Sequence, residues 1–278
     1  MNFICGDRFV ELADFVYTID NPDDYYKHPN TFDLKDIEAF DGVPIIYTLT
    51  GNAKPILAEL TNTTKRVILI THSADVPVDK ALYNLAPPNV SCWFAQNVAC
   101  HEDRLHAIPI GIENAQRKEF HHHDKPKRLL AQMAKEKTCK NLVYLNCSAW
   151  TNTDERMPLY KHLESKPWVT TIKNPNIFNF DEYIFNIHRH KFVACPSGNG
   201  IDTHRTWESL YLDSIPIEKK NFNNAFWADL PICFVNNWED IDEDFLNAEY
   251  ARIMSKEWNL DKLEFSFWEQ LIRYRAIK

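Results

Sequence analysis

The chain has 278 residues, of which 45% are hydrophobic and 25% are charged, a globular composition long enough for two domains of about 100–200 residues. Its net charge of −8 argues against a broad nucleic-acid surface, although a local basic pocket for an anionic small molecule is compatible with it. No apolar run reaches the roughly 18 residues of a membrane span, the first residues do not resemble a signal peptide, and the seven cysteines form no Cys-x-x-Cys pair. We therefore expect a cytoplasmic protein with reduced thiols and no membrane span.

Short apolar runs alternate with helical patterns in the first part of the chain. The runs predict strands at Val43–Leu49, Arg66–Thr71, Val90–Ala95 and Leu105–Ile110. Helical spacing lies between them at Ala53–Leu60 and Val78–Leu85. This alternation is typical of a parallel sheet flanked by helices. The first 40 residues match no pattern that we can assign.

A polar, basic segment from Asn114 to Lys140 follows, and Leu129–Lys137 within it has a helical pattern. The adjacent residues His121, His122 and His123 do not converge on one point, so a solvated linker explains them better than a metal site.

The alternation of strands and helices then starts again. Further strands are predicted at Asn141–Asn146, Val169–Ile172, Phe192–Cys195, Ile215–Glu218 and Ile232–Val235. Further helices are predicted at Arg156–Ser165, Phe180–His188, Thr203–Leu212, Asp242–Met254 and Leu263–Ala276. We expect an α/β fold with an N-terminal domain over residues 1–125 and a C-terminal domain over residues 126–278.

The segment Lys191–Lys219 combines a buried strand, a loop of small residues and a helix start. Pro196 ends the strand, because proline cannot donate to the ladder. The loop residues that follow are Ser197, Gly198, Asn199, Gly200, Ile201, Asp202 and Thr203. Glycine lets another group approach the main chain closely, and the amides at a helix start form an anion site suited to a diphosphate.

Charged and capping residues complete this segment. Asp202 and Thr203 are suitable helix caps, Arg205 can bind a phosphate, and Glu208 can accept hydrogen bonds from ribose hydroxyls. The alternative is a plain strand–turn–helix with a capped start, because Gly-x-Gly alone is a weak signal.

The pattern of this segment resembles the donor-domain signature of exostosin-like glycosyltransferases. It is carried by Phe192, Pro196, Gly198, Gly200, Asp202, Thr203, Arg205, Glu208 and the run Ser214-Ile215-Pro216. It is also similar to the ribitol xylosyltransferase domain and to short stand-alone enzymes of large DNA viruses and bacteria. The resemblance is strongest over 141–240 and weaker over 67–114.

The resemblance implies a GT-B arrangement, in which two Rossmann-like domains face each other across a cleft, and we expect the C-terminal helix to cross back to the first domain. It also implies inverting transfer of a sugar from a nucleotide-sugar, usually UDP-linked, to a glycan hydroxyl, without a bound metal. UDP-xylose is the preferred donor, because the xylosyltransferase relatives look closest. If the chain is viral, the host cytoplasm is its expected location. The sequence carries no signal for oligomeric state.

A second donor-side element follows the predicted strand Asn141–Asn146. The hydroxyls of Ser148 and Thr151, together with Asn152, can bind phosphate oxygens, and Arg156 can neutralise the charge of the leaving group. The alternative is a helix cap followed by a surface arginine.

Inverting transfer also needs a general base, which we expect in the first domain. Asp75 is the first choice and His72 the second, since both follow a predicted strand at its carboxyl end. Asp75 is equally explained as a turn or helix cap. Glu113, after another strand, either lines the acceptor side or lies in a turn.

Two competing functions remain open. Asp240 and Asp242 match the Asp-x-Asp pattern that holds a divalent metal in the other sugar-transferase fold, although acidic residues also suit the start of the following helix. A non-catalytic nucleotide-binding or glycan-binding module on the same scaffold is the other alternative.

Overall fold

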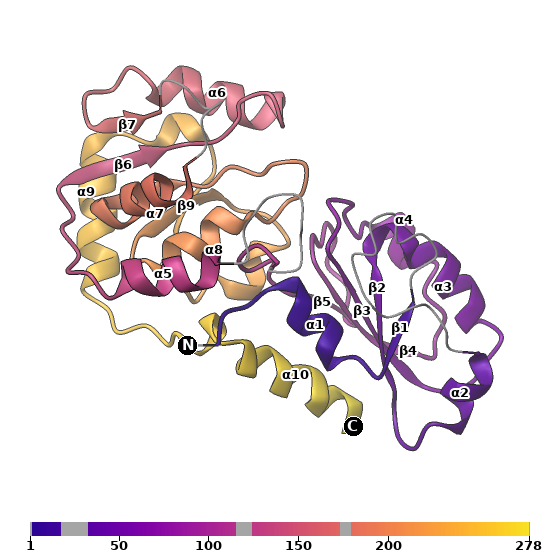
Figure 1. The fold of residues 1–278 in the computed structure, drawn as a ribbon. Coiled ribbons are helices and arrows are strands. Elements are labelled where there is room, and N and C mark those ends of the chain that lie inside the picture. The colour runs from indigo at the N-terminus through magenta and orange to yellow at the C-terminus, as the bar shows by residue number, and fades with distance from the viewer. Residues whose placement is uncertain (1, 18–32, 115–123, 173–178, 278) are drawn as a thin grey trace. The chain divides into compact units, whose positions relative to one another are not determined.

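The computed structural model describes residues 2–17, 33–114, 124–172 and 179–277, and the three adjacent histidines His121–His123 lie outside these ranges. The chain divides into two compact units (Figure 1). Unit 1 comprises Met1–His123 and Glu264–Lys278, and unit 2 comprises Asp124–Leu263. Each unit contains a five-stranded sheet whose paired strands are all parallel, so the expected α/β alternation is confirmed in both.

The sheet of unit 1 has the sequential order β1-β2-β3-β4-β5. Its strands are β1 (Phe15–Tyr17), β2 (Ile45–Leu49), β3 (Val67–His72), β4 (Val90–Ala95) and β5 (Leu105–Ala107). Its helices are α1 (Gly6–Leu12), α2 (Leu34–Ala39), α3 (Ala53–Leu60), α4 (Lys80–Tyr83) and α10 (Phe265–Ile277), with the 3₁₀ turn η1 (Thr50–Asn52) before α3. All six residues of β3 are buried, as expected for a central strand of a parallel sheet covered on both faces.

Two elements of unit 1 are shorter than the sequence predicts. The helix predicted over Val78–Leu85 is the single turn α4, because Val78 forms a β-bridge with Val98 and Asp79 caps the helix by accepting from the Leu82 amide. The last strand, β5, ends at Ala107 because Pro109 lacks the amide needed to continue the ladder.

The last helix, α10, belongs to unit 1, as expected of a C-terminal helix that crosses back. The Phe265 amide donates to the Asn2 carbonyl at 2.9 Å, and the Phe265 ring packs edge-on against Phe9. The predicted C-terminal domain of 126–278 included this helix, whereas the structure groups Glu264–Lys278 with unit 1, because the helix packs on elements from the start of the chain.

The sheet of unit 2 has the order β10-β9-β8-β6-β7. Its strands are β6 (Asn141–Leu145), β7 (Val169–Thr171), β8 (His190–Ala194), β9 (Ile215–Lys219) and β10 (Cys233–Val235). Its helices are α5 (Lys125–Met133), α6 (Thr153–Leu163), α7 (Phe180–Arg189), α8 (His204–Tyr211) and α9 (Glu243–Met254), with 3₁₀ turns η3 (Asn224–Trp227), η4 (Trp238–Asp240) and η5 (Asp261–Leu263). Among the described residues, no helix is both long enough and apolar enough to cross a membrane.

Side-chain capping explains where α6 and α7 begin. The side chain of Asn152 accepts from the Glu155 amide, so α6 begins at Thr153, three residues before its predicted start. Asn179 caps α7 by accepting from the amides of Asp181 and Glu182. These side chains satisfy amides that lack a partner within the helix.

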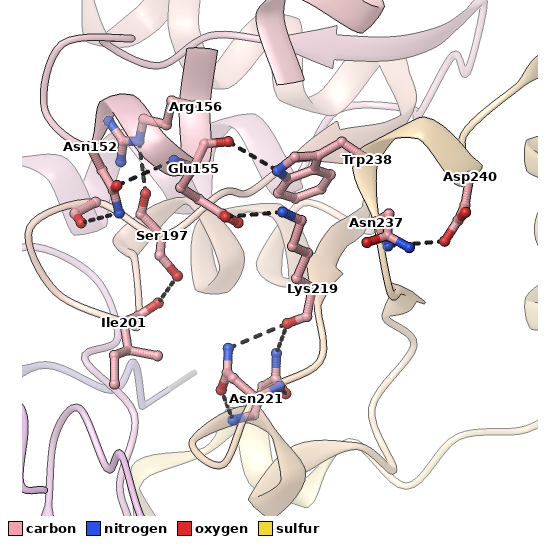
Figure 2. A network of polar contacts seen from close by, with 12 residues as sticks. Asn152, Glu155, Arg156, Ser197, Ile201, Lys219, Asn221, Asn237, Trp238 and Asp240 are labelled. Carbon is pink, nitrogen blue, oxygen red and sulfur yellow. Dashed lines mark hydrogen bonds and ion pairs between the residues drawn. The ribbon is translucent and has the colours of Figure 1, made fainter. Parts of the chain in front are cut away.

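One polar network ties the start of α6 to the sheet (Figure 2). Lys219 at the end of β9 forms an ion pair with Glu155 at 3.1 Å and lies over the Trp238 ring. The Trp238 indole in turn donates to the Glu155 carbonyl at 3.0 Å. The position of α6 is therefore fixed relative to the carboxyl end of β9.

Candidate functional site

The strand order of unit 2 contains a topological switch point between β6 and β8. From β6 the chain passes to β7 on one side and then to β8 on the other. In open parallel sheets of this kind, ligands bind beyond the carboxyl ends of the two strands at which the order reverses. The loops after β6 and β8, together with the helices α6 and α8 that follow them, contain all the predicted donor-side residues, and the topology brings the two loops to one sheet edge.

The loop after β8 is held closed by its own main chain. The Gly198 amide donates to the Gly200 carbonyl at 2.9 Å, and the Ser197 hydroxyl donates to the Ile201 carbonyl at 3.0 Å. Gly200 is buried beneath the loop, whereas Asn199 is exposed. The small residues of this loop therefore form a compact turn with one exposed side chain at its centre.

Arg156 braces this turn against the loop after β6. Its Nε donates to the Ser197 carbonyl at 2.9 Å (Figure 2). Its Nη1 donates to the Ser148 carbonyl, also at 2.9 Å. A Cβ atom on Gly198 would lie 2.7 Å from Nη2 of Arg156, so a larger residue at this position must displace the guanidinium. Arg156 is buried, and burial lowers its pKa. Its hydrogen bonds from Nε and Nη1 make it a brace for the two loops, and its predicted role of neutralising the leaving group stays a prediction.

The other residues predicted after β6 divide into two kinds. Asn152 caps α6 and donates from Nδ2 to the Gly198 carbonyl at 3.0 Å, which adds a second link between the two loops. Ser148 and Thr151 are exposed beside this link, where their hydroxyls are accessible to a ligand.

Arg205 lies in the first turn of α8, immediately after the braced loop. Its Nε atom is buried and has no hydrogen-bond partner. Its charge lowers the otherwise raised pKa values of three tyrosines, which are Tyr144 on β6, Tyr160 on α6 and Tyr183 on α7. Burial is the main cause that raises the pKa of Tyr144, to about 12. The guanidinium therefore lies near the ends of β6 and β8, where the topology predicts a ligand.

The start of α8 has no side-chain cap. Thr203 occupies the N-cap position without making a capping hydrogen bond, and the first turn contains no acidic residue. The carboxylate of Asp202 accepts instead from the Trp207 indole at 2.9 and 3.1 Å and from the Thr203 amide at 2.8 Å. Asp202 thus fixes the entry into the helix from the residue before the N-cap, whereas the first turn itself has no side-chain cap.

Glu208 is buried, and its Oε2 accepts from the Tyr183 hydroxyl at 2.7 Å. Burial raises the pKa of Tyr183 well above its usual value, so this hydroxyl remains a donor. Tyr183 on α7, which is distant in sequence, therefore holds one oxygen of the carboxylate on which the predicted ribose contact depends, and that contact stays a prediction.

A buried carboxyl that the sequence analysis missed lies next to this site. Glu218 on β9 accepts from the Thr206 hydroxyl and, at 3.0 Å, from Nδ2 of Asn224. Burial, together with the charge of Asp202, raises the pKa of Glu218 to about 7 despite these hydrogen bonds. The only signal in the sequence is an acidic residue that follows the apolar run of a predicted buried strand.

The candidate bases in unit 1 have different environments. His72 is 1% exposed, and its two ring nitrogens lie 3.1 Å from the Ser73 hydroxyl and from the Pro109 carbonyl. Asp75 is exposed in the turn after β3. Glu113 is half-buried beyond β5. His72 is therefore the better ordered of the candidates, but its burial separates it from solvent.

The acidic pair considered for metal binding caps two helices. Asp240 forms a capping box with Asn237 in η4, and Asp242 accepts from the Phe245 amide at the start of α9. Across the described ranges, no three or more His, Cys, Asp or Glu side chains are grouped so that they could hold a metal ion. The capping interpretation of Asp240 and Asp242 is the one that the geometry favours.

No family model and no curated protein matches the chain. Among solved structures, it is similar to HepE from Anabaena in complex with UDP-glucose, with 12% identity and a TM-score of 0.48 over 83% of this chain and 77% of that one. It is also similar to the UDP-forming alpha,alpha-trehalose-phosphate synthase of Burkholderia vietnamiensis, with 8% identity and a TM-score of 0.43 over 88% of this chain and 71% of that one. At such identities, the roles of individual residues depend on this chain's own geometry.

Proposed function

We propose that the protein is a glycosyltransferase that binds the diphosphate of a UDP-sugar at the β6/β8 switch point of unit 2. The observation that carries this proposal is Arg205, whose buried Nε has no partner beside a helix start that no side chain caps. Leaving a buried N–H donor without a hydrogen bond is costly, and an anionic ligand that accepts from Nε removes that cost.

The main chain supplies the rest of the anion site. The amides at the start of α8 and in the braced turn Ser197–Asp202 are suited to phosphate oxygens, and the exposed hydroxyls of Ser148 and Thr151 can add donors from the facing loop. Arg205 supplies a permanent charge, because a guanidinium remains protonated at any physiological pH. Arg156 acts indirectly by fixing the two loops.

The reaction that we assign to this site follows the sequence resemblance. It is inverting transfer from a UDP-sugar to a glycan hydroxyl without a bound metal, with UDP-xylose as the first donor to test. The general base comes from the segment His72–Asp75 of unit 1. In this proposal unit 2 is the donor domain, and unit 1, which includes α10, is the acceptor-side domain.

Calorimetry with UDP tests the anion site directly. Arg205→Ala should raise the Kd of UDP at least about 100-fold, which corresponds to about 2.7 kcal/mol. Arg252→Ala is the matched control, because Arg252 is an exposed arginine on α9 that pairs with Glu249, and it should leave the Kd unchanged. An unaltered Kd in Arg205→Ala would remove the assignment.

A thermal-shift panel of nucleotide-sugars then identifies the donor, since a ligand at 100 times its Kd adds about 2.7 kcal/mol of stability. UDP binding without turnover of any donor would identify a non-catalytic binding module instead.

A further inference from the structure

We infer that unit 2 has a second binding site, a hollow along α6 that takes an uncharged saccharide chain, with Trp150 at its rim stacking on one of the sugar rings. This inference goes beyond the proposed sugar transfer and does not depend on it. The hollow is lined by residues of unit 2 alone, and they differ from those assigned to the UDP site.

The hollow has a volume of about 990 Å³ and is bounded by α6, the loop after β6 and η4. Its lining includes Ala149 of the loop, Glu239 of η4 and, on α6, Asp154, Met157, Pro158 and Lys161. These four α6 residues follow the spacing i, i+3, i+4 and i+7, so they share one face of the helix. Arg156 of the same helix points instead toward the loop after β8 (Figure 2). The hollow and the braced loops therefore use different faces of α6.

Hydrogen bonds hold the walls of the hollow in place. The Tyr160 hydroxyl donates to the Cys147 carbonyl at 2.5 Å and accepts from the Cys147 amide at 3.2 Å, which fixes the loop after β6 to α6. Nε2 of His162 lies 2.8 Å from the Ile241 carbonyl, which fixes α6 to the residue that follows η4. The hollow is thus formed before any ligand binds, as is usual for ligand sites that combine apolar walls with a few polar groups.

Trp150 lies at the rim of the hollow, because Ala149 before it and Thr153 after it both line the hollow. Its side chain is 80% exposed, whereas the other seven tryptophans, all within the described residues, are buried or half-buried. The turn that carries Trp150 is fixed at Ser148, whose carbonyl accepts from Arg156. An indole held out in this way gains stability when its apolar face is covered, and the C–H face of a sugar ring is a suitable cover.

The charge of the hollow selects the class of ligand. The carboxylates of Asp154, Glu164 and Glu239 line it together with one ammonium group, that of Lys161. This excess of negative charge disfavours phosphates, nucleotides and acidic sugars. The hydroxyls of a neutral sugar can donate to the carboxylates and accept from the ammonium group. Pro158 adds an acceptor, because it has no amide to donate to the Asp154 carbonyl.

The length of the hollow favours a chain of sugars over a single one. Thr153 and Glu164, at the two ends of α6, both line it. At 1.5 Å per helical residue they lie about 16 Å apart along the helix axis, which is long enough for several sugar rings in a row. Affinity should therefore rise with the length of the saccharide.

Calorimetry of the full chain with cellotetraose, xylotetraose, maltotetraose and chitotetraose tests the site. At least one tetrasaccharide should bind with a Kd below about 10 mM, and its monosaccharide should bind at least about tenfold more weakly. Trp150→Ala and Met157→Glu should each raise the Kd of that tetrasaccharide at least about tenfold, the first by removing the ring and the second by placing a further carboxylate against the sugar. Both positions are exposed, so the variants should remain folded.

Phe185→Ala is the matched control, because Phe185 is an exposed aromatic residue of α7 that does not line the hollow. It should bind the tetrasaccharide like wild type, and Met157→Glu should bind UDP like wild type. Acrylamide quenching gives a second readout, because a bound saccharide should protect the emission of the exposed Trp150. That protection should be absent in Trp150→Phe.

Failure of all four tetrasaccharides to bind at about 10 mM would overturn the inference, and so would an equal Kd in wild type, Trp150→Ala and Met157→Glu. Binding of tetralysine in place of the saccharides, weakened in Met157→Ala, would also overturn it and would identify a cationic peptide as the ligand. A wild-type chain that binds a tetrasaccharide at this site but does not bind UDP would overturn the transferase function and leave the saccharide site standing.

Discussion

Nε of Arg156 donates to the Ser197 carbonyl at 2.9 Å, while Nη2 of the same guanidinium lies against Gly198. One side chain on α6 thereby sets the shape of the loop after β8. Any residue larger than glycine at 198 must displace this guanidinium, because its Cβ would lie 2.7 Å from Nη2.

The first prediction concerns this contact. Gly198→Ala should raise the Kd of UDP about tenfold, or about 1.4 kcal/mol, because the displaced guanidinium no longer fixes the turn. Gly51→Ala is the control, since a Cβ at Gly51 meets nothing within 4 Å. Calorimetry on both variants checks the prediction, and an equal Kd in the two would show that the turn does not shape the UDP site.

A second prediction follows from Glu218. Its pKa is raised from 4.5 to about 7, chiefly by burial. Between pH 4.5 and pH 7, Glu218 is therefore protonated in the folded chain but ionised in the unfolded chain. Stability should therefore fall as the pH rises from about 4.5 through 7, by up to an amount on the order of 3 kcal/mol.

Urea unfolding measured at pH 5 and pH 8 tests this dependence. In Glu218→Gln, the unfolding free energy should fall less between pH 5 and pH 8 than it does in wild type. In the exposed control Glu257→Gln, it should fall as much as in wild type. The pH slope is the relevant quantity, because the new amide faces Nδ2 of Asn224 and changes the stability at every pH. Parallel slopes for wild type and Glu218→Gln would refute the assignment.

The alternation of strands and helices was predictable because it depends on local patterns. The buried run that became β3, for example, is apolar and β-branched throughout. The lateral order of the strands was not predictable, because the hydrophobic periodicity of a strand does not indicate which strands lie next to it in the sheet. The switch point between β6 and β8, which supports the donor site most strongly after Arg205, therefore emerged only from the structure.

The candidate site was also predictable only in part: the position of a residue was predictable, but its partners were not. The position of Arg205 in the first turn of α8 follows from its spacing after the loop, and the structure leaves its Nε without a hydrogen-bond partner. The roles of Asp202 and Glu208 were not predictable, because their partners Trp207 and Tyr183 compete with a ligand for the same carboxylates. Sequence spacing indicates which side chains share a face, but it does not indicate which are already paired.

A third prediction concerns metal dependence. Asp240 and Asp242 each accept a main-chain amide at a helix start, so they are engaged in capping. Asp242→Ala should cost about 1 kcal/mol of stability, as expected for loss of an N-cap, without changing the kcat for UDP-xylose. Transfer activity should also survive EDTA. A complete loss of activity that manganese restores would favour the metal-dependent alternative.

A fourth prediction separates two glycines of unit 1 by their surroundings. Gly111 has a φ of +66°, and a Cβ there would collide with the main chain of Ile4. This segment holds the start of the chain against the sheet, since the Ile112 amide donates to the Ile4 carbonyl at 2.8 Å. Gly111→Ala should therefore destabilise the chain by about 3 kcal/mol, because neither backbone can move without breaking that bond.

Gly51→Ala, with open space around the new methyl group, should change the unfolding free energy by less than about 0.5 kcal/mol. Urea denaturation of the two variants distinguishes them, and equal stabilities would mean that the contact between Ile4 and Gly111 does not hold the N-terminal segment in solution.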